Sequence, residues 1–156
     1  MGTIVQRIAL TLDYPVCFSD AVFNAKNPDL AAALSRKEPA RRQRCLFVIE
    51  ERVAELWPCL AQDIQAYAAA HASSLELTGA PLVVRGGEDC KNDDRAPAQL
   101  LARFEAEKLD RQSHVVIVGG GALQDLVGYA AAIAFILFLM IAFATLLQMR
   151  FQEKRG

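Results

Sequence analysis

Residues 114–129 read HVVIVGGGALQDLVGY, an apolar run that ends in three glycines and passes at once into a helical pattern. The run Val115–Val118 is short, continuous and β-branched, which is typical of a buried parallel strand. Glycines lack a Cβ atom and let the backbone approach a phosphate closely, while the unpaired N–H groups of a following helix favour an anion. The stretch therefore predicts a strand, a turn that can hold a pyrophosphate, and a helix.

As a dinucleotide fingerprint this turn is incomplete. Gly119 and Gly121 match the first two glycines of the usual pattern, but Gln124 stands at the third position. The acidic residue expected about 20 positions later is missing, because that region is apolar. A tight strand-to-helix turn without a ligand therefore stays open as an alternative.

Strand and helix patterns alternate along the rest of the chain. Besides the strand at 115–118, we expect strands over 4–12, 46–49 and 81–84, and helices over 30–34, 60–71 and 97–109. This alternation predicts an α/β fold, with a Rossmann-like parallel sheet, flanking helices and a C-terminal apolar helix.

A second glycine pair, Gly86 and Gly87, follows the predicted strand at 81–84, and Glu88 and Lys91 come next. A carboxylate can hold the hydroxyl pair of a ribose, and an ammonium group can meet a phosphate. Taken alone, this motif favours a charged surface turn.

Together, the two motifs resemble 3-dehydroquinate synthase and its sugar-phosphate cyclase relatives. The family pattern joins Gly-Glu-x-x-Lys, here residues 87–91, to Gly-Gly-Gly-x-x-x-Asp-x-x-Gly, an aromatic residue and x-Ala-Ala, here residues 119–132. Residues 14–16, 53–58 and 86–92 resemble the 2-epi-5-epi-valiolone synthase-like branch. The likeness runs from residue 4 to residue 134 and covers the N-terminal, NAD-binding half of a family member.

The resemblance implies that NAD binds between the two motifs, at the ends of the parallel strands. The residues that would contact the nicotinamide side and ribose of NAD are Gly87, Glu88 and Lys91. Those that would surround the pyrophosphate are Gly120, Gly121, Ala122 and Asp125. Glu50 stands where the family has an aspartate after a strand, and it would hold the adenosine ribose.

The reaction that the resemblance implies begins when NAD oxidises one hydroxyl of a heptulose-type sugar phosphate. Phosphate is then eliminated, the ketone is reduced again, and an aldol step closes a carbocycle. In the full-length family, zinc or another divalent metal polarises the substrate. This chain has two histidines, His71 and His114, and no third ligand completes a zinc site, so we predict no metal or catalytic residues here. We expect a truncated cyclase that is inactive without a complementing C-terminal half.

An apolar stretch without charge follows the glycine turn, over residues 129–147. As a helix it would be about 28 Å long, close to the thickness of a bilayer's hydrocarbon core. We expect an NAD-binding domain over 1–128, a transmembrane helix over 129–149 and a basic tail over 150–156. In a rival interpretation, residues 129–134 belong to the cofactor helix and a frameshift product begins at residue 135.

Charge and cysteine content narrow the class of protein further. A net charge of −1 disfavours a nucleic-acid partner. The four cysteines are scattered, and no signal-peptide pattern opens the chain, so we expect a cytoplasmic domain, anchored to a membrane through residues 129–147. The resemblance also implies a homodimer. The alternative function is a membrane-anchored nucleotide-binding or interaction module without catalysis.

Overall fold

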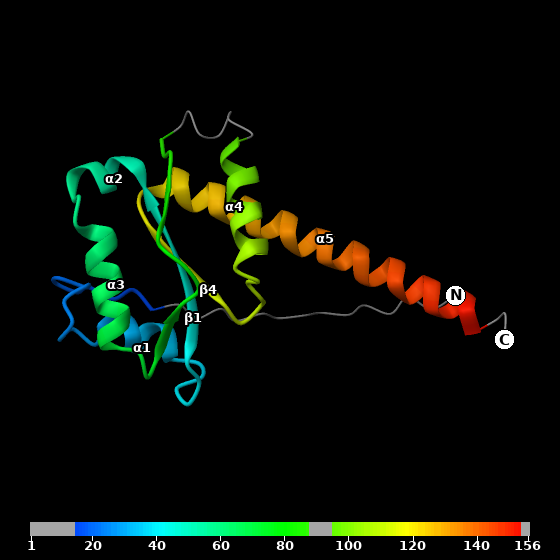
Figure 1. Cartoon of the computed structure of the whole chain (residues 1–156), viewed down its shortest axis with the longest axis horizontal. Helices are drawn as coiled ribbons and strands as arrows, with labels where there is room; N and C mark the ends of the chain where they lie inside the picture. Colours follow the sequence, from blue (N-terminus) through cyan, green and yellow to red (C-terminus); the bar gives the residue numbers. More distant parts are fainter. Residues whose placement is uncertain (1–14, 88–94, 154–156) are drawn as a thin grey trace, which may run out of the picture.

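In the computed structural model, which describes residues 15–87 and 95–153, helices and strands alternate along the chain (Figure 1). In chain order the elements are α1 Asp29–Ser35, β1 Gln43–Glu50, α2 Glu51–Leu56, α3 Leu60–Ala70, β2 Leu75–Leu77, β3 Leu82–Val84, α4 Arg95–Ala106, β4 His114–Val118 and α5 Gly121–Glu153. The predicted strand over residues 4–12 lies outside the described residues.

Within the described residues, four strands form one parallel sheet with β1 at its centre. β2 pairs with the first half of β1, from Gln43 to Cys45, and β3 pairs with the second half, from Val48 to Glu50. β4 pairs with β1 from Cys45 to Ile49. Because a strand has two edges, β2 and β3 share one edge of β1 and β4 takes the other. The predicted α/β fold with a parallel sheet and flanking helices is confirmed.

The break between β2 and β3 was not anticipated. Leu77 pairs with Cys45 and Leu82 pairs with Val48, so residues 78–81 stand opposite only residues 46–47. The extra residues between β2 and β3 therefore bulge away from β1. Pro81 is one of residues 78–81, and it has no N–H to donate to a neighbouring strand. A strand of three residues is too short to show a recognisable hydrophobic period, so β2 was not predicted from the sequence.

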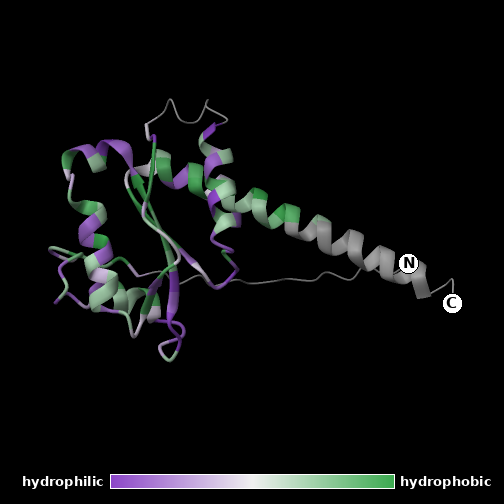
Figure 2. Cartoon of the chain, viewed as in Figure 1, coloured by the Kyte–Doolittle hydropathy of each residue, from purple (hydrophilic) through white to green (hydrophobic). Residues whose placement is uncertain are grey.

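Helices cover both faces of the sheet. On one face, α4 and the start of α5 pack against Leu46 and Val48 of β1. On the other face, α1 and α3 pack against Cys45, Phe47 and Ile49. β1 is therefore buried on both sides, as a central parallel strand should be, and hydrophobic residues fill its second half (Figure 2). Burial raises the pKa of the Cys45 thiol to about 11.

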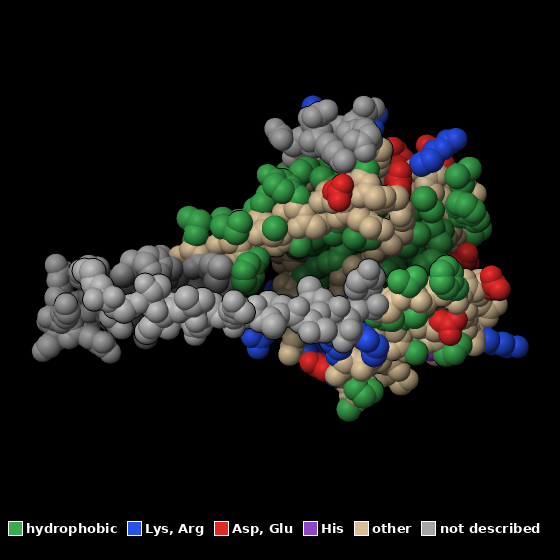
Figure 3. All heavy atoms as spheres, turned by 180° about the vertical axis from the view of Figure 1, so that it is seen from behind, with side chains coloured by type: hydrophobic (Ala, Val, Ile, Leu, Met, Phe, Trp, Pro, Cys, Tyr) green, Lys and Arg blue, Asp and Glu red, His purple; other side chains and the backbone are tan. Residues whose placement is uncertain are grey.

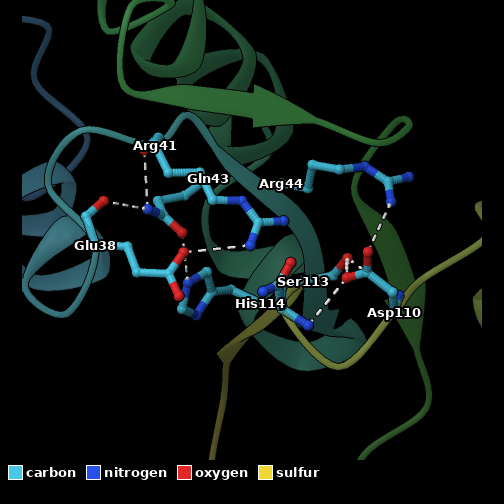
Figure 4. A network of polar contacts seen from close by, with 8 residues as sticks. Glu38, Arg41, Gln43, Arg44, Asp110, Ser113 and His114 are labelled. Atoms are coloured by element: carbon cyan, nitrogen blue, oxygen red, sulfur yellow. Dashed lines mark hydrogen bonds and ion pairs between the residues drawn. The ribbon is translucent and has the colours of Figure 1, made fainter.

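A polar network holds the opposite, amino end of β1 and β4 together (Figure 4). The Gln43 side chain is buried, and its Nε2 donates to the carbonyl oxygens of Glu38 and Arg41, both at 2.9 Å. Its Oε1 lies 3.2 Å from Nε2 of His114. Since the Gln43 amide group already donates twice, its oxygen accepts, and His114 carries its proton on Nε2. This end of the sheet is fixed by fully paired polar groups.

Helix α5 runs without a break through the predicted domain boundary at residue 128 and projects far beyond the sheet (Figure 1). Hydrophobic side chains are exposed where α5 extends beyond the sheet (Figure 3). Among those that the structure describes are Phe135, Ile136, Leu137 and Met140. Across the residues that the structure describes, no helical stretch combines the length and the hydropathy that a membrane crossing needs. The predicted transmembrane helix over 129–149, and the anchor through 129–147, are therefore not confirmed.

Candidate functional site

The order of the strands creates a topological switch point at the carboxyl end of the sheet. From β1 the chain passes through α2 and α3 to β2 and β3 on one edge, and α4 then carries it back to β4 on the other edge. The loops after β1 and β4 consequently lead to helices on opposite faces of the sheet. In open α/β sheets, ligands bind at such a switch point, outside the carboxyl ends of the strands.

Glu50 and Gly120 meet at this switch point. Glu50 is the last residue of β1, and its Oε2 accepts a hydrogen bond of 2.8 Å from the backbone N–H of Gly120. Gly120 directly precedes α5. The structure thus brings together two of the residues predicted to contact NAD. The carboxylate of Glu50, which was predicted to hold the adenosine ribose, instead contacts the glycine turn predicted to hold the pyrophosphate.

The second glycine turn also lies against Glu50. A Cβ atom at Gly86 would overlap the Glu50 side chain, and one at Gly119 would lie 2.8 Å from Glu50 Oε2 and 2.9 Å from its Cβ. Both distances are too short for ordinary contacts, so a side chain at either position would force Glu50 to move. The turns after β3 and β4 therefore lie on either side of one carboxylate.

Gly86 and Gly119 belong to the two predicted glycine turns, but they were not among the residues predicted to contact NAD. Each directly follows a strand pattern or stands one residue beyond it, and each faces an acidic residue that ends the neighbouring strand. The sequence shows both glycines after strand patterns, but the contact of both with Glu50 depends on the order of the strands. Gly87, which was predicted, has a φ of +85°, a conformation that other residues rarely adopt.

The remaining predicted pyrophosphate contacts lie on the first turns of α5. Gly121 and Asp125 are exposed, and Ala122 is half-buried. The first N–H groups of a helix have no acceptor within the helix, and the helix dipole gives them a partial positive charge. Leu123, Leu126 and Val127 are buried in the core shared with α4, which fixes the direction in which these amides point.

Two predicted contacts cannot be placed, because Glu88 and Lys91 lie outside the described residues. Their strand of origin, β3, ends next to β1 at Glu50. The loop that carries them therefore starts at the same end of the sheet as the glycine turn after β4.

An open hollow of about 670 Å³ lies beside this site and was not anticipated. Its walls include Val118, the last residue of β4. They also include Val53 of α2, the helix that begins directly after Glu50, and Trp57, which follows the end of α2. Phe23 and Leu60 add further apolar surface. Apolar side chains make up most of its walls, and Ser19, Asn24 and Asp63 add polar groups.

The histidines have structural surroundings. The ring of His71 packs against that of Tyr67, with a centroid distance of 4.4 Å and an angle of 37° between the ring planes, and His114 belongs to the network around Gln43. Among the residues that the structure describes, no group of histidine, cysteine, aspartate and glutamate side chains could hold a metal ion.

The family model described as 3-dehydroquinate synthase N-terminal matches residues 81–149. This match supports the predicted relationship of the chain to the 3-dehydroquinate synthase superfamily. It includes β3, both glycine turns, β4 and α5 as far as residue 149, whereas β1 and Glu50 lie outside it. Residues 135–147, which the rival interpretation assigned to a frameshift product, lie inside it. No curated protein and no solved structure gave a match.

Proposed function

We propose that this chain is the NAD-binding part of a sugar-phosphate cyclase of the 3-dehydroquinate synthase superfamily. The observation that carries the proposal is the meeting of two glycine turns at one carboxylate, at the switch point of a parallel sheet. Both turns lie within the segment matched by the family model, so the geometry and the comparison support the same ligand.

Among the described residues, nothing blocks the backbone next to Gly87 and Gly121. A Cβ atom at Gly87 or at Gly121 would meet nothing within 4 Å, so both glycines are open on their outer side. The amides at the start of α5 would hold the pyrophosphate, as helix N-termini commonly do. Glu50 would hold the adenosine ribose, and the hollow next to Trp57 would receive the adenine.

The bound NAD would supply a hydride acceptor for the substrate hydroxyl. The part of this chain is to hold the cofactor, with Glu88 and Lys91 at the nicotinamide ribose. The heptulose-type sugar phosphate and the zinc or other divalent metal would be held by a complementing C-terminal half. Within the superfamily, we favour the 2-epi-5-epi-valiolone synthase-like branch, because residues 53–58 and 86–92 carry its pattern.

Isothermal titration calorimetry of the folded chain with NAD tests the proposal. We expect measurable binding that weakens roughly tenfold in Glu88→Ala, since the charge-assisted hydrogen bond that its carboxylate would accept from a ribose hydroxyl contributes about 1.5 kcal/mol. Glu105→Ala, which removes an exposed carboxylate at the far end of α4, is the matched control and should bind like the parent. Absence of NAD binding by protein with a native circular dichroism spectrum would refute the proposal.

Adding the metal-binding half of a superfamily member separates this function from the alternative. If the mixture releases phosphate from a heptulose phosphate in the presence of zinc, the chain is the cofactor part of a cyclase. If NAD binds and no phosphate is released, the chain is a nucleotide-binding module without catalysis.

A further inference from the structure

The carboxylate of Glu50 places a negative charge at a turn that favours an anionic ligand. We propose that the Glu50 carboxylate is an internal occupant of the pyrophosphate turn, and that it must leave Gly120 before a dinucleotide binds. This inference rests on the proposed function, because it concerns the same site. It makes Glu50 a residue that sets the preference of the turn between a bare pyrophosphate and a nucleoside-linked one.

The first step is the hydrogen bond itself. Oε2 of Glu50 accepts the N–H of Gly120 at 2.8 Å. A carboxylate oxygen and a phosphate oxygen are both anionic acceptors, and backbone amides bind both in the same geometry. One N–H cannot serve both at full strength, so Glu50 and a phosphate compete for this amide.

The second step is the slot that holds the side chain. Gly86 and Gly119 have no Cβ atoms, and a Cβ at either would strike Glu50. A Cβ at Gly120 would still lie 3.6 Å from Oε2. The carboxylate is thus flanked by the backbone of two turns, whereas Gly121 beside it stays open. A phosphate reaching the amides of α5 through that open side would lie next to a negative charge as long as Glu50 stays in the slot.

The third step is where the carboxylate goes. Glu50 is partly exposed, so rotation of its side chain can carry the carboxylate out of the slot without disturbing the buried part of β1. Once outside, it can accept hydrogen bonds from a ribose hydroxyl pair, the role expected for an acid at this strand end. The same residue then weakens binding of pyrophosphate alone and favours binding of a nucleotide.

Titration of the full chain with inorganic pyrophosphate and, separately, with NAD tests the proposal. The variants are Glu50→Ala, Glu50→Gln and the neighbouring Glu51→Gln, which removes an exposed charge on α2 as a control. We expect pyrophosphate to bind at least about fivefold more tightly to Glu50→Ala and Glu50→Gln, because a like charge next to the turn is removed. NAD should gain less than pyrophosphate does, since the ribose contact is lost. Glu51→Gln should match the parent in both titrations.

The outcomes separate this proposal from simple helix capping and from failure of the proposed function. If Glu50 only caps α5, the variants lose stability towards urea and pyrophosphate binding stays unchanged, which overturns the proposal. Failure of every variant to bind pyrophosphate overturns it as well. If pyrophosphate binding tightens while no variant binds NAD, the occupant role holds and the proposed function fails. Glu50→Gln keeps an acceptor for Gly120, so it carries the test if Glu50→Ala does not fold.

Discussion

Single residues determine how the two ends of the sheet differ. At the amino end, Gln43 satisfies three polar partners and holds β1, β4 and the loop before β1 together. At the carboxyl end, Glu50 makes one hydrogen bond within the described part of the chain, and two glycines leave space for its side chain. A saturated network resists change, whereas a carboxylate with one partner can exchange it, which is why we place binding at the carboxyl end.

Asp110 should make the fold more sensitive to acid. The hydroxyl of Ser113 and the backbone N–H of Gln112 donate to its carboxylate and lower its pKa, with a smaller contribution from Arg44. A pKa lowered in the folded state adds stability above the unfolded value of about 3.9, and that stability is lost as the pH falls through the folded value. Asp110→Asn should therefore show a smaller drop in urea midpoint between pH 7 and pH 3.5 than the parent does.

Asp63→Asn, an exposed change on α3, is the control for this measurement. An unchanged pH dependence in Asp110→Asn would show that the hydrogen bonds of this turn do not contribute to folding.

At the level of the elements, the first turns of α5 do different work from the rest of the helix. Leu123, Leu126 and Ala130 are buried against α4 and the sheet, whereas side chains from Phe135 outward are exposed. The buried turns direct the helix N-terminus at Glu50. Figure 2 shows the corresponding change, from mixed hydropathy at the start of α5 to hydrophobic residues farther along.

Truncation of side chains on α5 should therefore have unequal costs. Leu123→Ala removes a fully buried side chain and should lower the free energy of unfolding by about 2–5 kcal/mol. Phe135→Ala should change it by less than about 0.5 kcal/mol, because the side chain is 61% exposed. Urea unfolding followed by circular dichroism measures both. Equal effects would mean that the outer part of α5 packs against the body in solution.

For the whole molecule, the outer part of α5 creates a solubility problem. Ile136 and Met140 lie one helical turn apart and are both more than half exposed. Exposed apolar surface of this kind drives association between molecules. We expect the purified chain to self-associate at micromolar concentration in detergent-free buffer.

Sedimentation velocity checks this expectation. The double variant Ile136→Glu and Met140→Glu should shift the distribution towards the monomer, whereas Gln99→Glu, on the exposed side of α4, should not. A parent chain that sediments as a single monomeric species would contradict it.

The sequence by itself determined the features that depend on neighbouring residues. The apolar run at 115–118 and the glycines after it specified β4, the turn and the start of α5, because burial and the lack of a Cβ atom act locally. Residues 46–49, the hydrophobic part of β1, were likewise predicted as a buried strand. Helix α5 was expected to change character at residue 129, yet its backbone continues, since nothing in the stretch interrupts helical hydrogen bonding.

Only the tertiary structure decided which strand ends meet. Glu50 and Gly120 are 70 positions apart, and their contact depends on β4 pairing with β1 on the edge opposite β2 and β3. No local pattern encodes that order, because it follows from which helix covers which face. The same holds for the fit of Glu50 between Gly86 and Gly119: the sequence supplied an acid and two glycines, and the packing of parallel strands put them in contact.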